Sequence, residues 1–190
     1  IVSNRSLCMN SHAHCIFEYI YFARLDSKMD GINIYDARVS AGKALADAYP
    51  IDADLVVGVP DSGIAAAIGY AEQSNIPYGM AFHKNSYVGR TFIKPTQQER
   101  ESAVHIKLNV IPSVVAGKRI VLIDDSIVRG TTISKLITML KRAGATEVHV
   151  RISSPPFLYP CYYGTDVPSN NLLIASKHTP EEIANQIGAD

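Results

Sequence analysis

One stretch of this sequence, from Lys118 to Thr132 (KRIVLIDDSIVRGTT), most constrains what the chain can fold into. Its first part, Ile120–Ile123, is a short apolar run that is β-branched at three of four positions. Such a run is typical of a strand buried on both faces, as strands of parallel sheets are. Two adjacent carboxylates, a small turn and a helical pattern from Ile133 to Ala143 follow it. The order of strand, turn and helix predicts an α/β fold.

The turn after this strand has the composition of a binding site. Ligands of open α/β sheets sit outside the carboxyl ends of the strands, and a turn that opens a helix offers backbone N–H groups to an anion. The carboxylates of Asp124 and Asp125 would repel a phosphate, but they suit polyol hydroxyls or a magnesium ion. The stretch therefore predicts a sugar-phosphate site, with an acidic, solvated βα turn as the alternative. The turn's hydroxyl donors and its glycine are Ser126, Gly130, Thr131 and Thr132.

The string VLIDDSIVRGTT resembles the phosphoribosyl pyrophosphate (PRPP) motif of type I phosphoribosyltransferases, in the version carried by the amidophosphoribosyltransferase family. The insert Ser126–Arg129 makes the match specific. The resemblance implies a type I phosphoribosyltransferase fold: a central, mostly parallel sheet with helices on both faces and a flexible catalytic lid. It also implies that Asp124 and Asp125 hold the ribose hydroxyls and magnesium. The residues after them that it implies for PRPP binding are Ser126, Ile127, Val128, Arg129, Gly130, Thr131 and Thr132.

Composition fits one globular domain and argues against several classes of protein. The 190 residues suffice for a sizeable core. Eighteen basic and eighteen acidic residues cancel, so we expect neither a nucleic-acid footprint nor a charged membrane surface. No apolar run approaches the roughly 20 residues of a membrane span, and the first residues are too polar for a secretory signal, which predicts a cytoplasmic protein. We expect residues 1–14 to be a tail or connector and residues 15–190 to form the phosphoribosyltransferase domain.

A second strand–turn–helix unit lies earlier in the chain. Apolar spacing predicts a helix over Ile34–Ala48, a buried strand over Asp54–Pro60 and a helix over Ile64–Gln73. In the resembling family the turn between the last two receives the pyrophosphate of PRPP, and the residue in the place of Ser62 lies at the magnesium site. From the residues alone, an ordinary βα turn is the alternative. The turn consists of Pro60, Asp61, Ser62 and Gly63.

The chain changes character at Lys84, after a predicted strand over Pro77–His83. Residues 84–100 are basic, partly aromatic and without a clean period, which suits a lid that closes over a polyanion and excludes water. The segment is similar to the family's flexible catalytic loop, with Ser86 where an arginine is usual. A solvated surface loop is the alternative. The residues that the resemblance implies to be catalytic are Lys84, Tyr87 and Arg90.

The remaining segments complete the predicted architecture. Glu147–Ile152 alternates apolar and polar residues, which predicts a strand, and Ser153–Pro156 forms a rigid turn after it. Three strand ends are therefore expected to meet at one crevice. We expect the apolar-aromatic run Ile16–Phe22 to form a strand or a linker packed on the core. Leu172–Ser176 is expected to form a short strand and Thr179–Ile187 a final helix.

The three cysteines form no disulfide framework. Taken alone, each is expected to be a buried, inert thiol. In the iron–sulfur branch of the resembling family, however, ligands occur at the positions of Cys15 and Cys161, and two more come from a Cys-x-x-Cys pair nearer the C-terminus. A [4Fe–4S] cluster needs four thiolates, so this sequence alone does not complete one. Cys8 fits no pattern.

The resemblance implies a PRPP-dependent amidotransferase of purine synthesis, a glycosyltransferase. It would form 5-phosphoribosylamine and pyrophosphate from PRPP and ammonia, with Mg²⁺ as cofactor. We expect this sequence to belong to a longer protein, a homo-oligomer whose glutaminase domain supplies the ammonia. Two readings remain beside it. One is a phosphoribosyltransferase whose acceptor is a base, and the other is a regulator that binds PRPP without turnover.

Overall fold

The computed structural model describes residues 14–85, 108–163 and 172–190. A three-stranded parallel sheet lies at its centre, in the order β3 (Leu55–Gly58), β6 (Arg119–Asp124) and β7 (Glu147–Ile152). Val57 pairs with Leu122, which in turn pairs with Val150, so all three carboxyl ends lie at one edge of the sheet. The parallel α/β architecture predicted from the sequence is confirmed, and ligand-binding loops belong at this edge.

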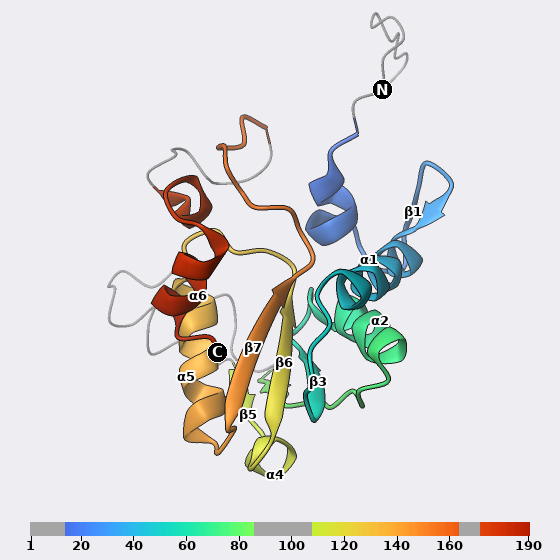
Figure 1. Cartoon of the computed structure of the whole chain (residues 1–190). Coiled ribbons are helices and arrows are strands. Elements are labelled where there is room, and N and C mark those ends of the chain that lie inside the picture. The colour runs from blue at the N-terminus through green and yellow to red at the C-terminus, as the bar shows by residue number, and fades with distance from the viewer. Residues whose placement is uncertain (1–13, 86–107, 164–171) are drawn as a thin grey trace, which may run out of the picture.

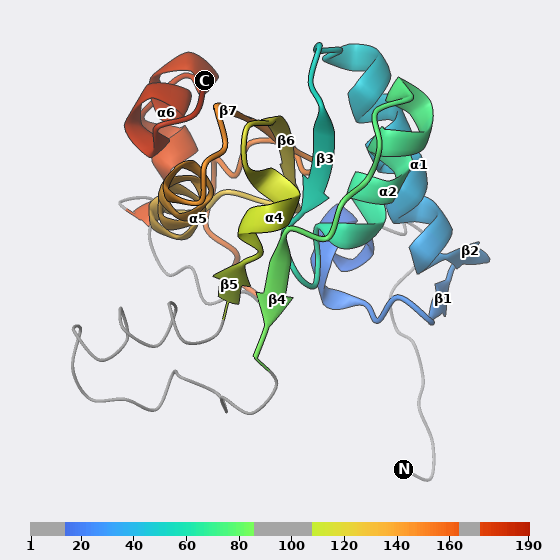
Figure 2. The same ribbon diagram turned by 90° about the horizontal axis from the view of Figure 1, so that it is seen from below.

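Helices cover both faces of the sheet (Figures 1 and 2). One face carries α1 (Ile34–Ala48) and α2 (Ile64–Ser74), and the other carries α5 (Thr131–Arg142) and α6 (Pro180–Ile187). The strand β6 serves both layers because its side chains alternate. Val121 and Ile123 pack in the α1–α2 core, whereas Ile120 and Leu122 pack in the α5–α6 core. This two-sided burial explains the continuous apolar run in the sequence.

The helices α1 and α2 approach each other closely because two glycines form the contact. A Cβ atom on Gly42 would lie 1.9 Å from the Ala66 carbonyl oxygen, and one on Gly69 would lie 2.0 Å from the Val39 carbonyl oxygen. No real Cβ atom tolerates such distances, so both positions require glycine at this spacing. The alanine-rich face of α2 then lies flat on the sheet.

Two short antiparallel pairs lie beside the main sheet. The hairpin β1 (Lys28–Met29) and β2 (Ile32–Asn33) precedes α1, and β4 (Phe82–Lys84) pairs with β5 (Leu108–Val110), which leads into α4 (Pro112–Val115). The strand predicted over Pro77–His83 thus begins later than expected. Before it, Tyr78 makes only an isolated parallel bridge to Val56 of β3.

The strand predicted over Leu172–Ser176 is wrong, because the structure has a 3₁₀ turn there, η4 (Ile174–Ser176). For Ile16–Phe22 we expected a strand or a linker packed on the core, and the structure has a π-helix, η1 (Glu18–Phe22), with Ile20 buried. The Ile174 N–H donates to the Val128 carbonyl oxygen at 2.9 Å, a loop contact that takes the place of a ladder bond.

Local capping signals fix the start of α6 and the end of α5. At α6, Thr179 and Glu182 form a capping box, with Glu182 N–H to Thr179 Oγ1 at 3.3 Å and Thr179 N–H to Glu182 Oε2 at 3.0 Å. After α5, Gly144 takes a φ of +101°, the left-handed conformation that ends helices. In the described part of the chain, no helix is both long enough and apolar enough to cross a membrane.

Candidate functional site

The two adjacent carboxylates lie at the carboxyl end of β6, where the parallel strands meet. Asp124 is the last residue of β6 and Asp125 begins the loop to α5; both are buried. The Ser62 hydroxyl donates to Asp125 Oδ1 at 2.7 Å, and the Ser126 hydroxyl donates to Asp125 Oδ2 at 2.6 Å. Ser62 belongs to the turn after β3. One carboxylate therefore ties together the two loops that the sequence predicts for the pyrophosphate and for the ribose phosphate.

The loop after β7 reaches the same place. The Ser153 N–H donates to the Asp124 carbonyl oxygen at 3.0 Å, and the Ser154 N–H donates to the Asp125 carbonyl oxygen at 2.9 Å. The backbone hydrogen bonds between β6 and β7 thus continue past the ends of both strands, as far as Asp125 and Ser154. The predicted convergence of three strand ends is confirmed.

The electrostatics of the acidic pair favour a cation. Burial raises the pKa of Asp124 well above its usual value, and the neighbouring charge of Asp125 raises it further. The Asp125 N–H donates to Asp124 Oδ1 at 2.9 Å, which partly offsets this effect. Carboxylate and hydroxyl oxygens are the hard ligands that Mg²⁺ prefers, and Mg²⁺ sites commonly use one or two carboxylates plus phosphate oxygens. Asp124, Asp125 and Ser62 therefore fit a magnesium ion, although no three His, Cys, Asp or Glu side chains gather within the described ranges.

The loop from Ser126 to Gly130 leads into the N-terminus of α5. Gly130, the N-cap of α5, takes a φ of +78°, and among the described residues no side chain caps the helix. The N–H groups of its first turn therefore suit an anion. Ile127 packs against the core, and the Val128 carbonyl oxygen is bonded to Ile174. Ile127 and Val128 thus hold the loop in place through an apolar contact and a backbone hydrogen bond, and neither side chain is polar. Thr131 and Thr132 open the helix on its exposed side.

The turn Pro60–Gly63 packs tightly beside the end of β6. A Cβ atom on Gly63 would lie 2.5 Å from the Ile123 carbonyl oxygen, so only glycine fits there. Asp61 forms an ion pair with Lys84, which lies at the end of β4. The predicted catalytic lysine is therefore positioned at the predicted pyrophosphate loop. Tyr87 and Arg90, and most of the predicted lid, lie outside the described residues.

The two candidate iron–sulfur ligands lie in segments that touch each other. Cys15 is exposed and Cys161 is half-buried. The rings of Phe17 and Phe157, each a few residues from one cysteine, meet edge to face with centroids 5.5 Å apart. The expectation of inert, buried thiols is wrong for Cys15, while the described residues supply two thiolates of the four that a cluster needs. Cys8 lies outside the described residues.

Arg38 is a buried charged residue that the sequence analysis did not single out. It is only 6% exposed, on the buried stripe of α1 that also holds Ile34 and Gly42. Its Nε donates to the Tyr19 carbonyl oxygen and its Nη2 to the Ala23 carbonyl oxygen, both at 2.8 Å. Burial lowers the pKa of Arg38, and attraction to Asp125 opposes this shift. Its position in the sequence could have revealed it, because Arg38 is a charged residue spaced four residues from Ile34 and from Gly42, on one face of the helix.

Comparisons with known proteins agree with this geometry. Residues 33–153 match the family described as phosphoribosyl transferase domain. The chain is 56% identical over 187 residues to the amidophosphoribosyltransferase of Bacillus subtilis, covering 98% of this chain and 38% of that protein. It is 57% identical over 178 residues to that of Archaeoglobus fulgidus, covering 94% of this chain and 39% of that protein. The chain spans about two fifths of the length of these curated relatives.

A solved structure gives the same picture. The glutamine phosphoribosylpyrophosphate amidotransferase from B. subtilis, in complex with ADP and GMP, superposes with a TM-score of 0.87 at 56% identity. The match covers 96% of this chain and 40% of that one. The fold described above is therefore that of a domain found within a larger enzyme.

Proposed function

Since this chain belongs to the phosphoribosyl transferase domain family, we propose that it is the PRPP-binding, ammonia-using transferase domain of an amidophosphoribosyltransferase. The proposal rests on one observation above all: Asp125 joins the Pro60–Gly63 turn to the Ser126–Gly130 loop through two hydroxyl donors. A ligand with phosphate at both ends and hydroxyls between them fits that arrangement. High identity to relatives named amidophosphoribosyltransferase supports the choice of acceptor.

Each group of residues then binds a different part of PRPP. The first turn of α5, with Ser126, Thr131 and Thr132, binds the 5′-phosphate through N–H and hydroxyl donors. Asp124 and Asp125 hold the ribose hydroxyls and, with Ser62, a Mg²⁺ ion, which supplies charge stabilisation for the pyrophosphate. The Pro60–Gly63 turn receives that pyrophosphate.

Ammonia is itself the nucleophile, so no side chain needs to be one. A bond forms between its nitrogen and C1 of the ribose, and the bond from C1 to the pyrophosphate oxygen breaks. A proton then passes from the nitrogen to solvent, which leaves neutral 5-phosphoribosylamine. Lys84 exchanges its ion pair with Asp61 for the leaving pyrophosphate, and Tyr87 and Arg90 join it from the lid.

Further parts of the proposal concern the longer protein. A glutaminase domain outside this sequence supplies ammonia from glutamine, as the name of the B. subtilis enzyme indicates for that protein. The whole protein works as a homo-oligomer in the cytoplasm. Cys15 and Cys161 contribute two ligands to a [4Fe–4S] cluster that is completed by cysteines from elsewhere.

The test is release of pyrophosphate from PRPP by the 190-residue chain with Mg²⁺, measured against pH with separate acceptors. Ammonium chloride should support release, and the rate should rise with pH as ammonium loses its proton, because only NH₃ has a free electron pair. Glutamine should not support release with this chain. Activity with hypoxanthine or orotate alone would assign it to base-dependent enzymes instead, and PRPP binding without turnover under any condition would favour a regulator.

A matched control separates the site from contaminating activity. The double variant Asp124→Asn with Asp125→Asn should lose release in every arm. An Asp47→Asn variant, which changes an exposed carboxylate on α1, should retain it.

A further inference from the structure

Asp61 places a carboxylate in the turn that receives the pyrophosphate under the proposed function. The turn leads into α2, and among the described residues no side chain caps that helix, so its first N–H groups suit an anion. The Asp61 carboxylate, by contrast, repels a polyanion at close range. Its side chain is 69% exposed, so it fills no space in the core. The carboxylate therefore calls for a role of its own.

Asp61 is not part of the candidate magnesium site. The neighbouring Ser62 hydroxyl donates to Asp125 Oδ1 at 2.7 Å and so belongs with the acidic pair. Asp61 does not join Asp124 and Asp125, because no three acidic, histidine or cysteine side chains gather within the described ranges. Its Oδ2 atom forms an ion pair with Lys84 Nζ instead. Adjacent side chains of the turn thus contact the acidic pair and a cation, respectively.

The backbones that carry this ion pair are held in place, whereas its side chains are open to solvent. Lys84 is the last residue of β4, where it pairs with Leu108 of β5. On the turn, a Cβ atom on Gly63 would lie 2.5 Å from the Ile123 carbonyl oxygen, so the turn packs directly on the end of β6. The Lys84 side chain is 37% exposed. A ligand in the turn can therefore reach Lys84 and take it from Asp61 without movement of either strand.

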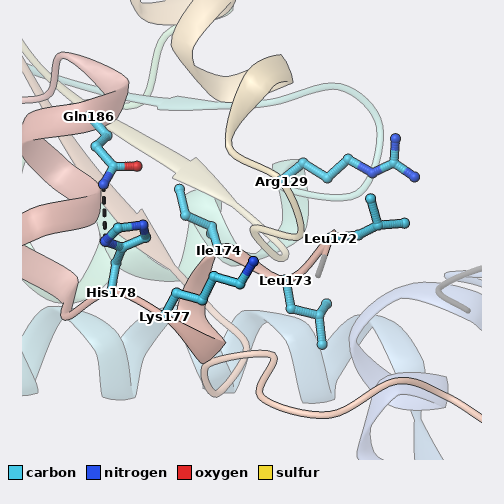
Figure 3. A pocket seen from close by; sticks show the side chains of 7 residues that line it. All are labelled: Arg129, Leu172, Leu173, Ile174, Lys177, His178 and Gln186. Carbon is cyan, nitrogen blue, oxygen red and sulfur yellow. Dashed lines mark hydrogen bonds between the residues drawn. The ribbon is translucent and has the colours of Figure 1, made fainter. Parts of the chain in front are cut away.

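The cation of the other phosphate-binding loop is arranged differently. Arg129 lies in the Ser126–Gly130 loop, here called the phosphate loop, and lines a hollow of about 350 Å³ between that loop, η4 and α6 (Figure 3). No carboxylate is among the described residues that line this hollow. Under the proposed function the 5′-phosphate stays on the sugar throughout the reaction, whereas the pyrophosphate must leave. The carboxylate counter-ion thus lies at the end of the substrate that is released.

We propose that Asp61 is a positioning residue that acts through Lys84 and hastens the release of pyrophosphate. In the ligand-free chain it holds Lys84 at the turn, and in the complex it competes with the diphosphate group for the same ammonium. The competition weakens the binding of PRPP and of pyrophosphate by the same factor, because both present that group. The inference rests on the proposed function, since it assumes that the turn binds pyrophosphate.

A double-mutant cycle tests the competition, with pyrophosphate titrated calorimetrically into the full chain at saturating Mg²⁺. Asp61→Asn should tighten binding about three- to fivefold, the effect of an exposed ion pair, because Lys84 is then available to the ligand. In a Lys84→Met background the same substitution should change the affinity less than about 1.5-fold. Equal gains in both backgrounds would show simple repulsion by Asp61 and would overturn the inference, as would no gain in the parent chain.

Two control variants accompany the cycle. Asp61→Glu keeps the charge and should bind pyrophosphate within about twofold of the parent chain, and a gain as large as that of Asp61→Asn would overturn the inference. Asp47→Asn removes an exposed carboxylate on α1 and should bind as the parent does.

Kinetics with PRPP and ammonia distinguish this role from a structural one. Asp61→Asn should lower the KM for PRPP and the inhibition constant of pyrophosphate, and kcat should not rise. A merely structural role would lower kcat or stability without lowering either constant, and that result would overturn the inference. If the parent chain binds no pyrophosphate at all, the assignment of the turn fails and the inference fails with it. Binding of pyrophosphate with equal gains in the cycle would overturn the inference alone.

Discussion

The two carboxylates of the acidic pair have different surroundings, and this sets their roles. Asp125 accepts hydrogen bonds from two serine hydroxyls, which stabilise its charge. The Asp124 carboxylate accepts a hydrogen bond from the Asp125 N–H, but burial and the neighbouring Asp125 carboxylate raise its pKa. The charge of Asp124 is therefore the one that a bound cation would stabilise most.

Asp124 should make the stability of the metal-free chain depend on pH. Its unfolded pKa is about 3.9 and its folded pKa is higher, so the folded state binds more protons between the two values. The free energy of unfolding should therefore be greatest below about pH 4 for this group and fall as pH rises through the raised pKa. Urea unfolding of the wild type and Asp124→Asn at several pH values measures this. The variant should lack that decline and be more stable at pH 7.

The same substitution should raise the stability of the chain and weaken its binding of ligands. Asp124→Asn should weaken binding of Mg²⁺ and PRPP at least about tenfold, near 1.4 kcal/mol, because a carboxylate ligand is lost. Calorimetric titration tests it, with Asp47→Asn as the control for an exposed acid. A variant that gains stability but binds with unchanged affinity would show that Asp124 is buried for another reason.

Arg38 should contribute to stability through the segment before α1. Its guanidinium donates to the carbonyl oxygens of Tyr19 and Ala23, and replacing Arg38 with Gln leaves both without a charged donor. We expect a loss of about 3 kcal/mol in the free energy of unfolding, from two charge-assisted hydrogen bonds. Arg24→Gln removes only an exposed ion pair with Asp26 and should cost under about 1 kcal/mol. Equal losses in both variants would contradict this account.

Elements with a regular apolar period were predictable, and those without one were not. The bounds predicted for α1 and β7 coincide with the structure, and those of α2 and α5 differ by a residue or two. The segments around η1 and η4 have no clear period. Distant residues contact both segments: Arg38 donates to the carbonyl oxygens of Tyr19 and Ala23, at the start and just after the end of η1, and the Val128 carbonyl oxygen accepts from Ile174. Sequence alone reveals neither partner.

At the contact between α1 and α2, two opposing effects decide whether Gly→Ala stabilises or destabilises the chain: helix propensity and overpacking. In an exposed helix Gly→Ala gains up to about 1 kcal/mol. At Gly42 the new Cβ atom would lie 1.9 Å from a backbone oxygen that cannot move without shifting α2. We expect Gly42→Ala to lower the free energy of unfolding by about 1–3 kcal/mol, since overpacking outweighs propensity. Urea unfolding checks it, and Ser40→Ala on the exposed side of α1 should be neutral or stabilising.

At the scale of the whole molecule, the meeting of the candidate site's loops was predictable because parallel strands end at one edge. The acidic pair, the serine at position 62 and the loop after β7 all follow from that rule, and the structure brings them together. Arg38 was not predicted, since a charge within a helix is usually assumed to face solvent. The hollow behind the phosphate loop was not predicted either, because it depends on how η4 and α6 pack against Val128 and Gly130.

The segment that carries Cys15 links the start of the domain to the site. It passes through η1, which Arg38 holds, and Arg38 is in turn attracted to Asp125. Phe17 also meets Phe157, which lies before Cys161. A cluster bound by both cysteines would therefore fasten two segments that already touch.

This arrangement predicts the behaviour of the iron. The 190-residue chain has three cysteines, so reconstitution with iron and sulfide should yield less than one stable [4Fe–4S] cluster per chain. In a longer protein that supplies two more cysteines, Cys15→Ser and Cys161→Ser should each abolish the cluster's visible absorbance, and Cys8→Ser should not. Loss of the cluster should also lower the melting temperature, because the contact between the Phe17 and Phe157 segments loses its covalent tie. Iron content and absorbance decide the first point without any activity assay. A full cluster in the Cys15 or Cys161 variant would remove that residue from the ligand set.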